Sequence, residues 1–112
     1  MKVCDPHFHL WNIRERPNPN LGEAVEQHLQ RYVATDYLAD MAQLPDPLEL
    51  VSSVHVETVV GQMQGGAVVD TVEETRFVSA QVGATKHPAG IVSYVHLGQD
   101  TALAEKVLQQ HA

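Results

Sequence analysis

The sequence predicts an α/β fold built on parallel strands. Three apolar segments with strand character, at residues 2–5, 50–57 and 91–97, alternate along the chain with segments of helical character. Strands that alternate with helices pair in parallel, because the helix carries the chain back to the edge of the sheet where the previous strand began. The third segment is almost entirely apolar, which indicates a strand buried on both faces.

The first strand is expected over residues 2–5 and should end at Pro6. Cys4 belongs to this apolar start and is expected to be a small buried side chain. Residues 10–21 are rich in proline, asparagine and arginine, a composition typical of a loop. A short helix should follow over residues 36–43, with Asp36 as its N-cap and Pro45 as its stop.

The second strand is expected over residues 50–57 because of its β-branched content. Three glycines in residues 61–66 indicate a loop. Asp70 and Glu73 have the spacing of a capping box, so a helix should run over residues 71–84.

The third strand is expected over residues 91–97, after a connection at residues 87–90. Asp100 should cap a last helix, whose apolar side chains recur at helical spacing on one face: Leu103, Val107 and Leu108. Three parallel strands cannot close a barrel and leave their edges exposed. We therefore expect residues 1–112 to form a single incomplete domain, with a complete small three-layer domain as the alternative.

Composition narrows the choice of partners and compartment. The chain has 112 residues, of which 44% are hydrophobic, and a formal net charge of −7. This acidity and the lack of a basic cluster oppose binding to nucleic acid or to an anionic membrane surface. Neither a signal peptide nor an apolar run long enough to span a membrane is present, so the expected location is cytoplasmic. One cysteine cannot form an internal disulfide.

The sharpest chemical signal is the segment Asp5-Pro6-His7-Phe8-His9-Leu10-Trp11. Side chains two residues apart lie on one face of an extended segment, so His7 and His9 should point the same way and can converge on one divalent ion. Asp5 should share this face and orient or neutralise the pair. Catalytic zinc normally takes three protein ligands, so two histidines are only part of a metal site.

The second strand supplies two further candidates. If Val54 and Val56 pack outward, His55 and Glu57 face the other side, and Glu57 ends the strand near the histidines of the first strand. Glu57 is the catalytic candidate and His55 the substrate-binding candidate. A carboxylate at this position can ligate metal, hold a water molecule or bind substrate. The alternative for Glu57 is an ordinary surface residue at the end of a strand.

The remaining histidines have weaker claims on function. His96 ends the third predicted strand, where it either belongs to the site or is a partly buried ring bonded to backbone. His28 and His111 lie among polar residues and are expected on the solvated surface. Arg76 is expected to make an ion pair. The sequence contains neither a nucleophile elbow nor a phosphate-binding loop, and no dinucleotide cofactor site is expected.

The first segment resembles the opening of the amidohydrolase superfamily, specifically its amidohydrolase-2 group of barrel hydrolases and lactonases. Residues 54–57, 74–78 and 91–97 resemble, in order, that group's second strand, next helix and third strand. The resemblance implies a partial (β/α)8 TIM barrel, comprising about the first three βα units. It also implies that His7 and His9 are the metal-site histidines of the first strand. This family often has an acidic residue where this chain has His96.

The implied reaction is attack of water on a carboxylic ester, lactone or amide of a small-molecule substrate. The implied cofactor is a divalent metal, with zinc as the first candidate, although some lactonases of this group work without a tightly bound metal. Related enzymes add later histidines and an aspartate that serves as base, so this chain alone should show little or no activity and should self-associate through its strand edges. The alternatives are a small non-catalytic metal-binding or interaction module that uses His7 and His9, and a chain that has lost its function.

Overall fold

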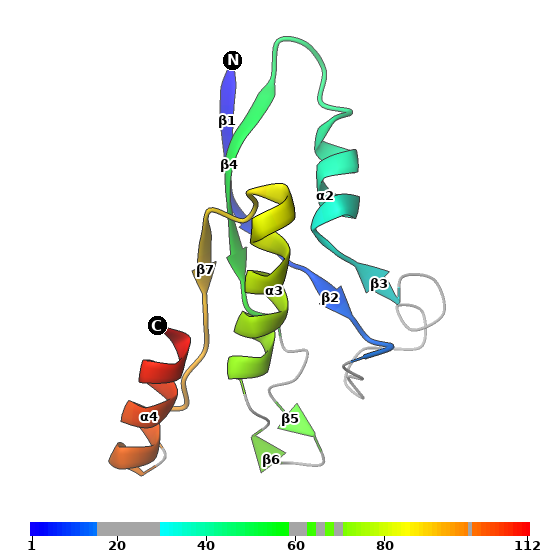
Figure 1. The fold of residues 1–112 in the computed structure, drawn as a ribbon. Coiled ribbons are helices and arrows are strands. Elements are labelled where there is room, and N and C mark those ends of the chain that lie inside the picture. The colour runs from blue at the N-terminus through cyan, green and yellow to red at the C-terminus, as the bar shows by residue number, and fades with distance from the viewer. Residues whose placement is uncertain (16–29, 59–62, 65–66, 69–70, 99) are drawn as a thin grey trace.

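The computed structural model describes residues 1–15, 30–58, 63–64, 67–68, 71–98 and 100–112. Its centre is a three-stranded parallel sheet in the order β1-β4-β7 (Figure 1). The strands are β1 (Lys2–Phe8), β4 (Glu49–Val56) and β7 (Gly90–Val92). The predicted mixed α/β fold with parallel strands is confirmed. The described residues form an open sheet and contain no closed barrel.

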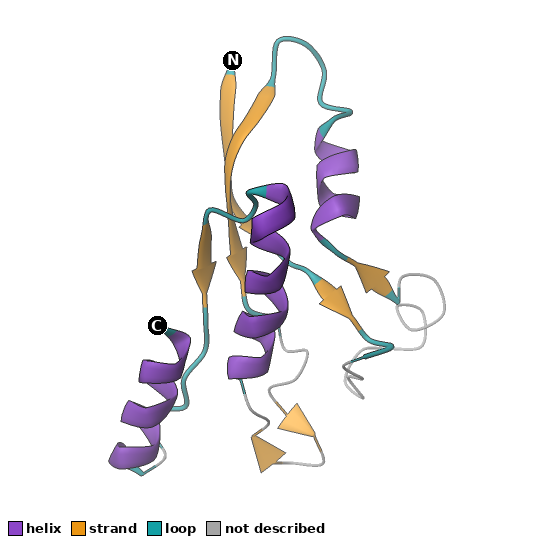
Figure 2. Cartoon of the chain, in the orientation of Figure 1, coloured by secondary structure: helices purple, strands orange, loops and turns teal. Residues whose placement is uncertain are grey.

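Three helices and two short hairpins complete the described structure (Figure 2). The helices are α2 (Ala34–Met41), α3 (Val72–Thr85) and α4 (Thr101–His111). The antiparallel hairpins pair β2 (Trp11–Asn12) with β3 (Arg31–Tyr32), and β5 (Met63–Gln64) with β6 (Ala67–Val68). Within the described residues, no helix combines the length and the apolar character needed to span a membrane.

Helices α2 and α3 cover the same face of the sheet. The Tyr37 ring of α2 stacks on the Phe8 ring of β1, with centroids 4.0 Å apart, and Phe8 in turn meets His55 of β4 edge to face. His55 contacts Glu74 of α3. Val78 of α3 lies in the same buried cluster as Phe8 and Tyr37. The core therefore fills the space between the sheet and these two helices.

The strand order bears on the class of α/β fold. Each new strand is added beside the previous one, so the order along the sheet follows the order along the chain. A doubly wound sheet reverses this order and so places helices on both faces, whereas a barrel adds every βα unit in the same direction. The described strands contain no such reversal, and α2 and α3 lie on one face of the sheet.

The first strand is longer than the sequence indicated. It continues through Pro6 to Phe8, because Pro6 lies where the register with β4 shifts and no backbone N–H is needed for the ladder. The expectation that Cys4 is buried is wrong, because the side chain is exposed.

The third strand is shorter than expected, at Gly90–Val92 instead of residues 91–97. Its register pairs Val92 with Val56, the last residue of β4, so the residues after Val92 have no ladder partner on that strand. The second strand agrees with the prediction to within one residue at each end.

The helix boundaries show what the capping signals could predict. Helix α2 begins at Ala34, two residues early, and Asp36 is not its N-cap; instead its carboxylate accepts the N–H of Val33 at 2.9 Å. Helix α3 matches the predicted 71–84 to within one residue, although Asp70 lies outside the described residues, as does most of the glycine loop at 61–66. Asp100 caps α4 as predicted, accepting the N–H of Leu103 at 3.2 Å.

Candidate functional site

The structure brings the two histidines of the first strand together. The Nε2 atoms of His7 and His9 lie 3.3 Å apart, and their rings meet edge to face. Two nitrogens that each bind a tetrahedral zinc ion at about 2.0–2.1 Å lie about 3.3–3.4 Å from each other. The spacing of the pair therefore fits two ligand positions of one tetrahedral ion.

The His9 ring is held from its other side. Its Nδ1 lies 2.7 Å from the carbonyl oxygen of Val56, at the end of β4. A carbonyl only accepts, so Nδ1 carries the proton and Nε2 presents its lone pair toward His7. Such a hydrogen bond from the second ring nitrogen is the usual way that proteins orient a metal-binding histidine. His9 is half-buried, whereas His7 is exposed to solvent.

Within the described residues, the histidine pair has no third potential metal ligand beside it. No group of three or more histidine, cysteine, aspartate or glutamate side chains within them is arranged to hold an ion. Asp5 does not join the pair, although the alternation of a regular strand would place it on the same face. Its carboxylate instead faces α2, where it accepts the Tyr37 hydroxyl at 3.0 Å. A metal role for the pair stays a prediction.

Glu57 lies at the same end of the sheet as the histidine pair. It directly follows Val56, whose carbonyl holds His9, and its own N–H donates to the carbonyl of Val92. The Glu57 carboxylate accepts the backbone N–H of Tyr94. These bonds fix Glu57 between the ends of β4 and β7, and the side chain is half-buried. Its catalytic role stays a prediction.

His55 lies beneath this end of the sheet, on the helix-covered face. Its ring is 0% exposed, and its Nε2 lies 3.4 Å from Oε1 of Glu74, which is equally buried. Glu74 also accepts the N–H of Thr58 at 3.0 Å. The ring centroids of His55 and His9 are 6.5 Å apart. His55 therefore supports the packing behind His9, and the predicted contact with substrate stays a prediction that this buried position does not favour.

Glu74 is a buried charged residue that sequence reasoning missed. The amphipathic pattern of the helix contained a signal for it, because Glu74 precedes the buried Val78 by one turn and so lies on the apolar face of α3. A carboxylate on such a face needs a polar partner, because an unpaired charge is costly to bury. His55 is the nearest ionisable candidate on the second strand.

His96 and Arg76 have surface positions. The prediction that His96 ends a strand is wrong, since β7 ends at Val92; its exposed ring lies 3.2 Å from the Tyr94 hydroxyl. The expected ion pair of Arg76 is confirmed, with Glu73 as its partner one helical turn earlier. His28 lies outside the described residues.

His111 is not the solvated residue that its polar neighbours suggested. The ring is half-buried between α4 and α3, where its Nδ1 lies 2.9 Å from Oγ1 of Thr75 and its Nε2 lies 3.3 Å from Oγ1 of Thr71. The Thr75 hydroxyl in turn contacts that of Ser93 at 2.7 Å. This polar cluster fastens the last turn of α4 to the rest of the chain.

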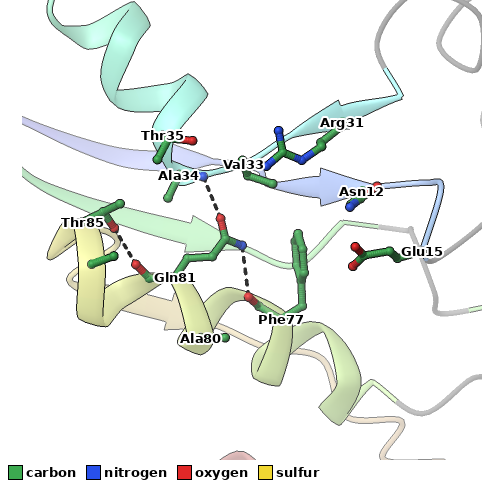
Figure 3. A pocket seen from close by; sticks show the side chains of 11 residues that line it. Asn12, Glu15, Arg31, Val33, Ala34, Thr35, Phe77, Ala80, Gln81 and Thr85 are labelled. Atoms are coloured by element: carbon green, nitrogen blue, oxygen red, sulfur yellow. Dashed lines mark hydrogen bonds between the residues drawn. The ribbon is translucent and has the colours of Figure 1, made fainter.

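A separate cleft of about 410 Å³ lies between the β2–β3 hairpin and the helices α2 and α3 (Figure 3). Phe77 of α3 stands at its centre, and its charged lining residues, Glu15 and Arg31, are exposed. The side-chain amide of Gln81 makes two hydrogen bonds: it accepts the N–H of Ala34 and donates to the carbonyl of Phe77. Because the two charged side chains among the described lining residues are exposed to solvent, the candidate site remains the histidine pair.

Comparison of the chain with protein families, curated proteins and solved structures finds no match. The likeness to amidohydrolases therefore rests on the motifs in the sequence.

Proposed function

We propose that the chain is the N-terminal part of an amidohydrolase-type barrel hydrolase, which cleaves a carboxylic ester, lactone or amide by attack of water. The observation that carries this proposal is the pairing of the His7 and His9 Nε2 atoms at the carboxyl end of β1. Barrel enzymes place their chemistry at this end of the strands. The sequential order of the three parallel strands supports the barrel.

The residues have distinct roles in this proposal. His7 and His9 hold the divalent metal, with zinc as the first candidate because imidazole nitrogen suits it. A metal bound there supplies a Lewis acid for the substrate carbonyl and lowers the pKa of bound water. Glu57, fixed at the end of β4, accepts a proton or holds a water molecule through its carboxylate. The substrate is a small molecule, and the protein acts in the cytoplasm.

Metal titration tests the histidine pair directly. We expect wild-type protein to bind about one equivalent of Zn²⁺ or Co²⁺ in calorimetry, and His7→Ala and His9→Ala each to weaken this binding at least tenfold. His96→Ala is the matched control, because it removes an exposed histidine outside the pair. An equal loss in His96→Ala, or no binding by the wild type, would contradict the proposal.

Activity assays test how much of the site this chain contains. Two ligands leave the metal weakly held, so we expect the isolated chain to hydrolyse a panel of lactones and activated esters no faster than the metal ion alone. Lactone hydrolysis by the pure chain that is abolished in His7→Ala would show instead that residues 1–112 form a complete active site.

The second candidate is a small metal-binding module without turnover. The observation that favours it is that His9 is already oriented by Val56, so the pair is preformed within this chain. The two candidates differ in solution behaviour. A complete module should unfold cooperatively as a monomer, whereas part of a barrel should self-associate through its exposed strand edges. Sedimentation together with thermal unfolding distinguishes them.

A further inference from the structure

Strand β1 contains one extra residue between Asp5 and Phe8, in the stretch that includes Pro6 and His7. Asp5 lies opposite Ser53 of β4, and Phe8 lies opposite His55, so three residue steps on β1 correspond to two on β4. This is the count of a β-bulge, in which an added residue breaks the alternation of side chains between the two faces. Pro6 lies within it, and proline is tolerated at bulges because it has no N–H to donate.

The bulge decides which side of the sheet each side chain faces. Asp5 and Phe8 are three residues apart and would face opposite sides of a regular strand. Both contact Tyr37 of α2 instead: Asp5 through the hydroxyl at 3.0 Å, and Phe8 through the stacked ring. His7 and His9 flank Phe8 in the sequence, and their rings meet edge to face at the carboxyl end of β1.

Asp5 closes the bulge with its side chain. Its Oδ1 accepts the backbone N–H of His7 at 3.1 Å, the local bond by which aspartate stabilises turns. Its Oδ2 accepts the hydroxyl of Tyr37, which is nearly fully buried. Burial, and then the hydrogen bond to Asp5, raise the pKa of Tyr37, so its hydroxyl keeps the proton that it donates.

We propose that Asp5 and Tyr37 are positioning residues, which hold the bulge at Pro6 and thereby direct His7 toward His9. This inference rests on the proposed metal site and names the two groups that set its geometry. Without the Asp5 carboxylate, the His7 N–H loses its partner within the bulge. The strand can then relax toward regular alternation, which moves His7 away from His9.

The test compares Asp5→Ala with the conservative Asp5→Asn. Asparagine retains a side-chain oxygen that can accept the His7 N–H. Its side-chain NH2 group can donate to the Tyr37 hydroxyl oxygen, so Asp5→Asn should keep the bulge. We expect Asp5→Ala to weaken Zn²⁺ binding about 10–100-fold, the usual effect of removing a group that orients a ligand, and Asp5→Asn to stay within a few-fold of wild type. Tyr37→Phe keeps the stacked ring and should give a smaller loss of Zn²⁺ affinity. This variant replaces Asp5→Ala as the test if Asp5→Ala does not fold.

The matched control is Tyr32→Phe. Tyr32 donates to Asp40 of α2 at 2.6 Å, so this variant removes a tyrosine–aspartate bond of the same kind outside the bulge. It should leave Zn²⁺ affinity unchanged. If Tyr32→Phe weakens Zn²⁺ binding as much as Tyr37→Phe, the effect is general destabilisation and the positioning role is refuted.

A second measurement separates this inference from the proposed function. In metal-free protein, the nuclear Overhauser contact between the His7 and His9 rings should be present in wild type and Asp5→Asn, and lost in Asp5→Ala. Suppose that the wild type shows this contact, that Asp5→Ala loses it, and that the wild type binds no Zn²⁺. The proposed function then fails and the positioning role stands. If Asp5→Ala keeps both the contact and wild-type affinity, the positioning role is overturned.

Discussion

The first two strands with their helices differ from the last strand and its helix in how far their apolar side chains are buried. Around β1 and β4, Phe8, Leu10 and Val78 share one buried cluster with Tyr37. Around β7 and α4, Leu97 is 76% exposed and Leu108 is 51% exposed. The same kind of apolar pattern predicted both regions. The difference teaches that a pattern identifies the face that favours burial, while a packed neighbour is needed to bury it.

Other apolar side chains of the last strand and helix are exposed as well. Val92 of β7 and Leu103 of α4 are among them. Strand β7 is also an edge strand, since its described ladder is with β4 alone.

The largest expected effect on stability comes from comparing a buried glutamate of α3, Glu74, with its exposed neighbour, Glu73. Glu74→Ala removes the buried partner of His55, and leaving one member of a buried polar pair unmatched costs about 3–5 kcal/mol of unfolding free energy. Glu73→Ala is the matched control, because it breaks an exposed ion pair with Arg76 that contributes about 0–1 kcal/mol. Urea unfolding midpoints measure both. Equal midpoints would show that the His55–Glu74 contact contributes nothing to stability.

The next largest effect on stability is expected from a leucine-to-alanine substitution made in each of the two regions. Leu10→Ala empties a site in the buried cluster and should cost about 2–5 kcal/mol of unfolding free energy. Leu103→Ala acts on an exposed side chain of α4 and should stay within about 0.5 kcal/mol of wild type. Urea unfolding of the two variants gives the comparison. A large loss in Leu103→Ala would mean that α4 is packed in solution and would break the contrast between the regions.

Local signals predicted most of the fold. The β-branched content of residues 50–57 gave the central strand to within one residue at each end, and the helix expected at 71–84 is α3. These elements were predictable because their patterns are long and their neighbours lie within the chain. Strand β7 failed because its length depends on where β4 ends, which no pattern in residues 91–97 contains.

The proximity of the two histidines was predictable, and their surroundings were not. The spacing of His7 and His9 was sufficient to predict their convergence. The contact of the Asp5 carboxylate with Tyr37 was not predicted, because alternation assumes a regular strand and the bulge between Asp5 and Phe8 depends on pairing with β4. The partner of His55 was missed because it comes from a helix about twenty residues later, and only tertiary packing brings Glu74 to it.

The smallest expected effect concerns association between copies of the chain. If the apolar side of β7 and α4 drives self-association, Leu108→Lys should weaken it several-fold, because a charge in an apolar contact must lose its hydration. Gln109→Lys is the matched control, since it adds the same charge at the neighbouring exposed position of α4. Sedimentation velocity over a range of concentrations measures both. If the two variants associate equally, net charge explains the change, and the exposed apolar side chains of α4 are ordinary surface residues that need no neighbour.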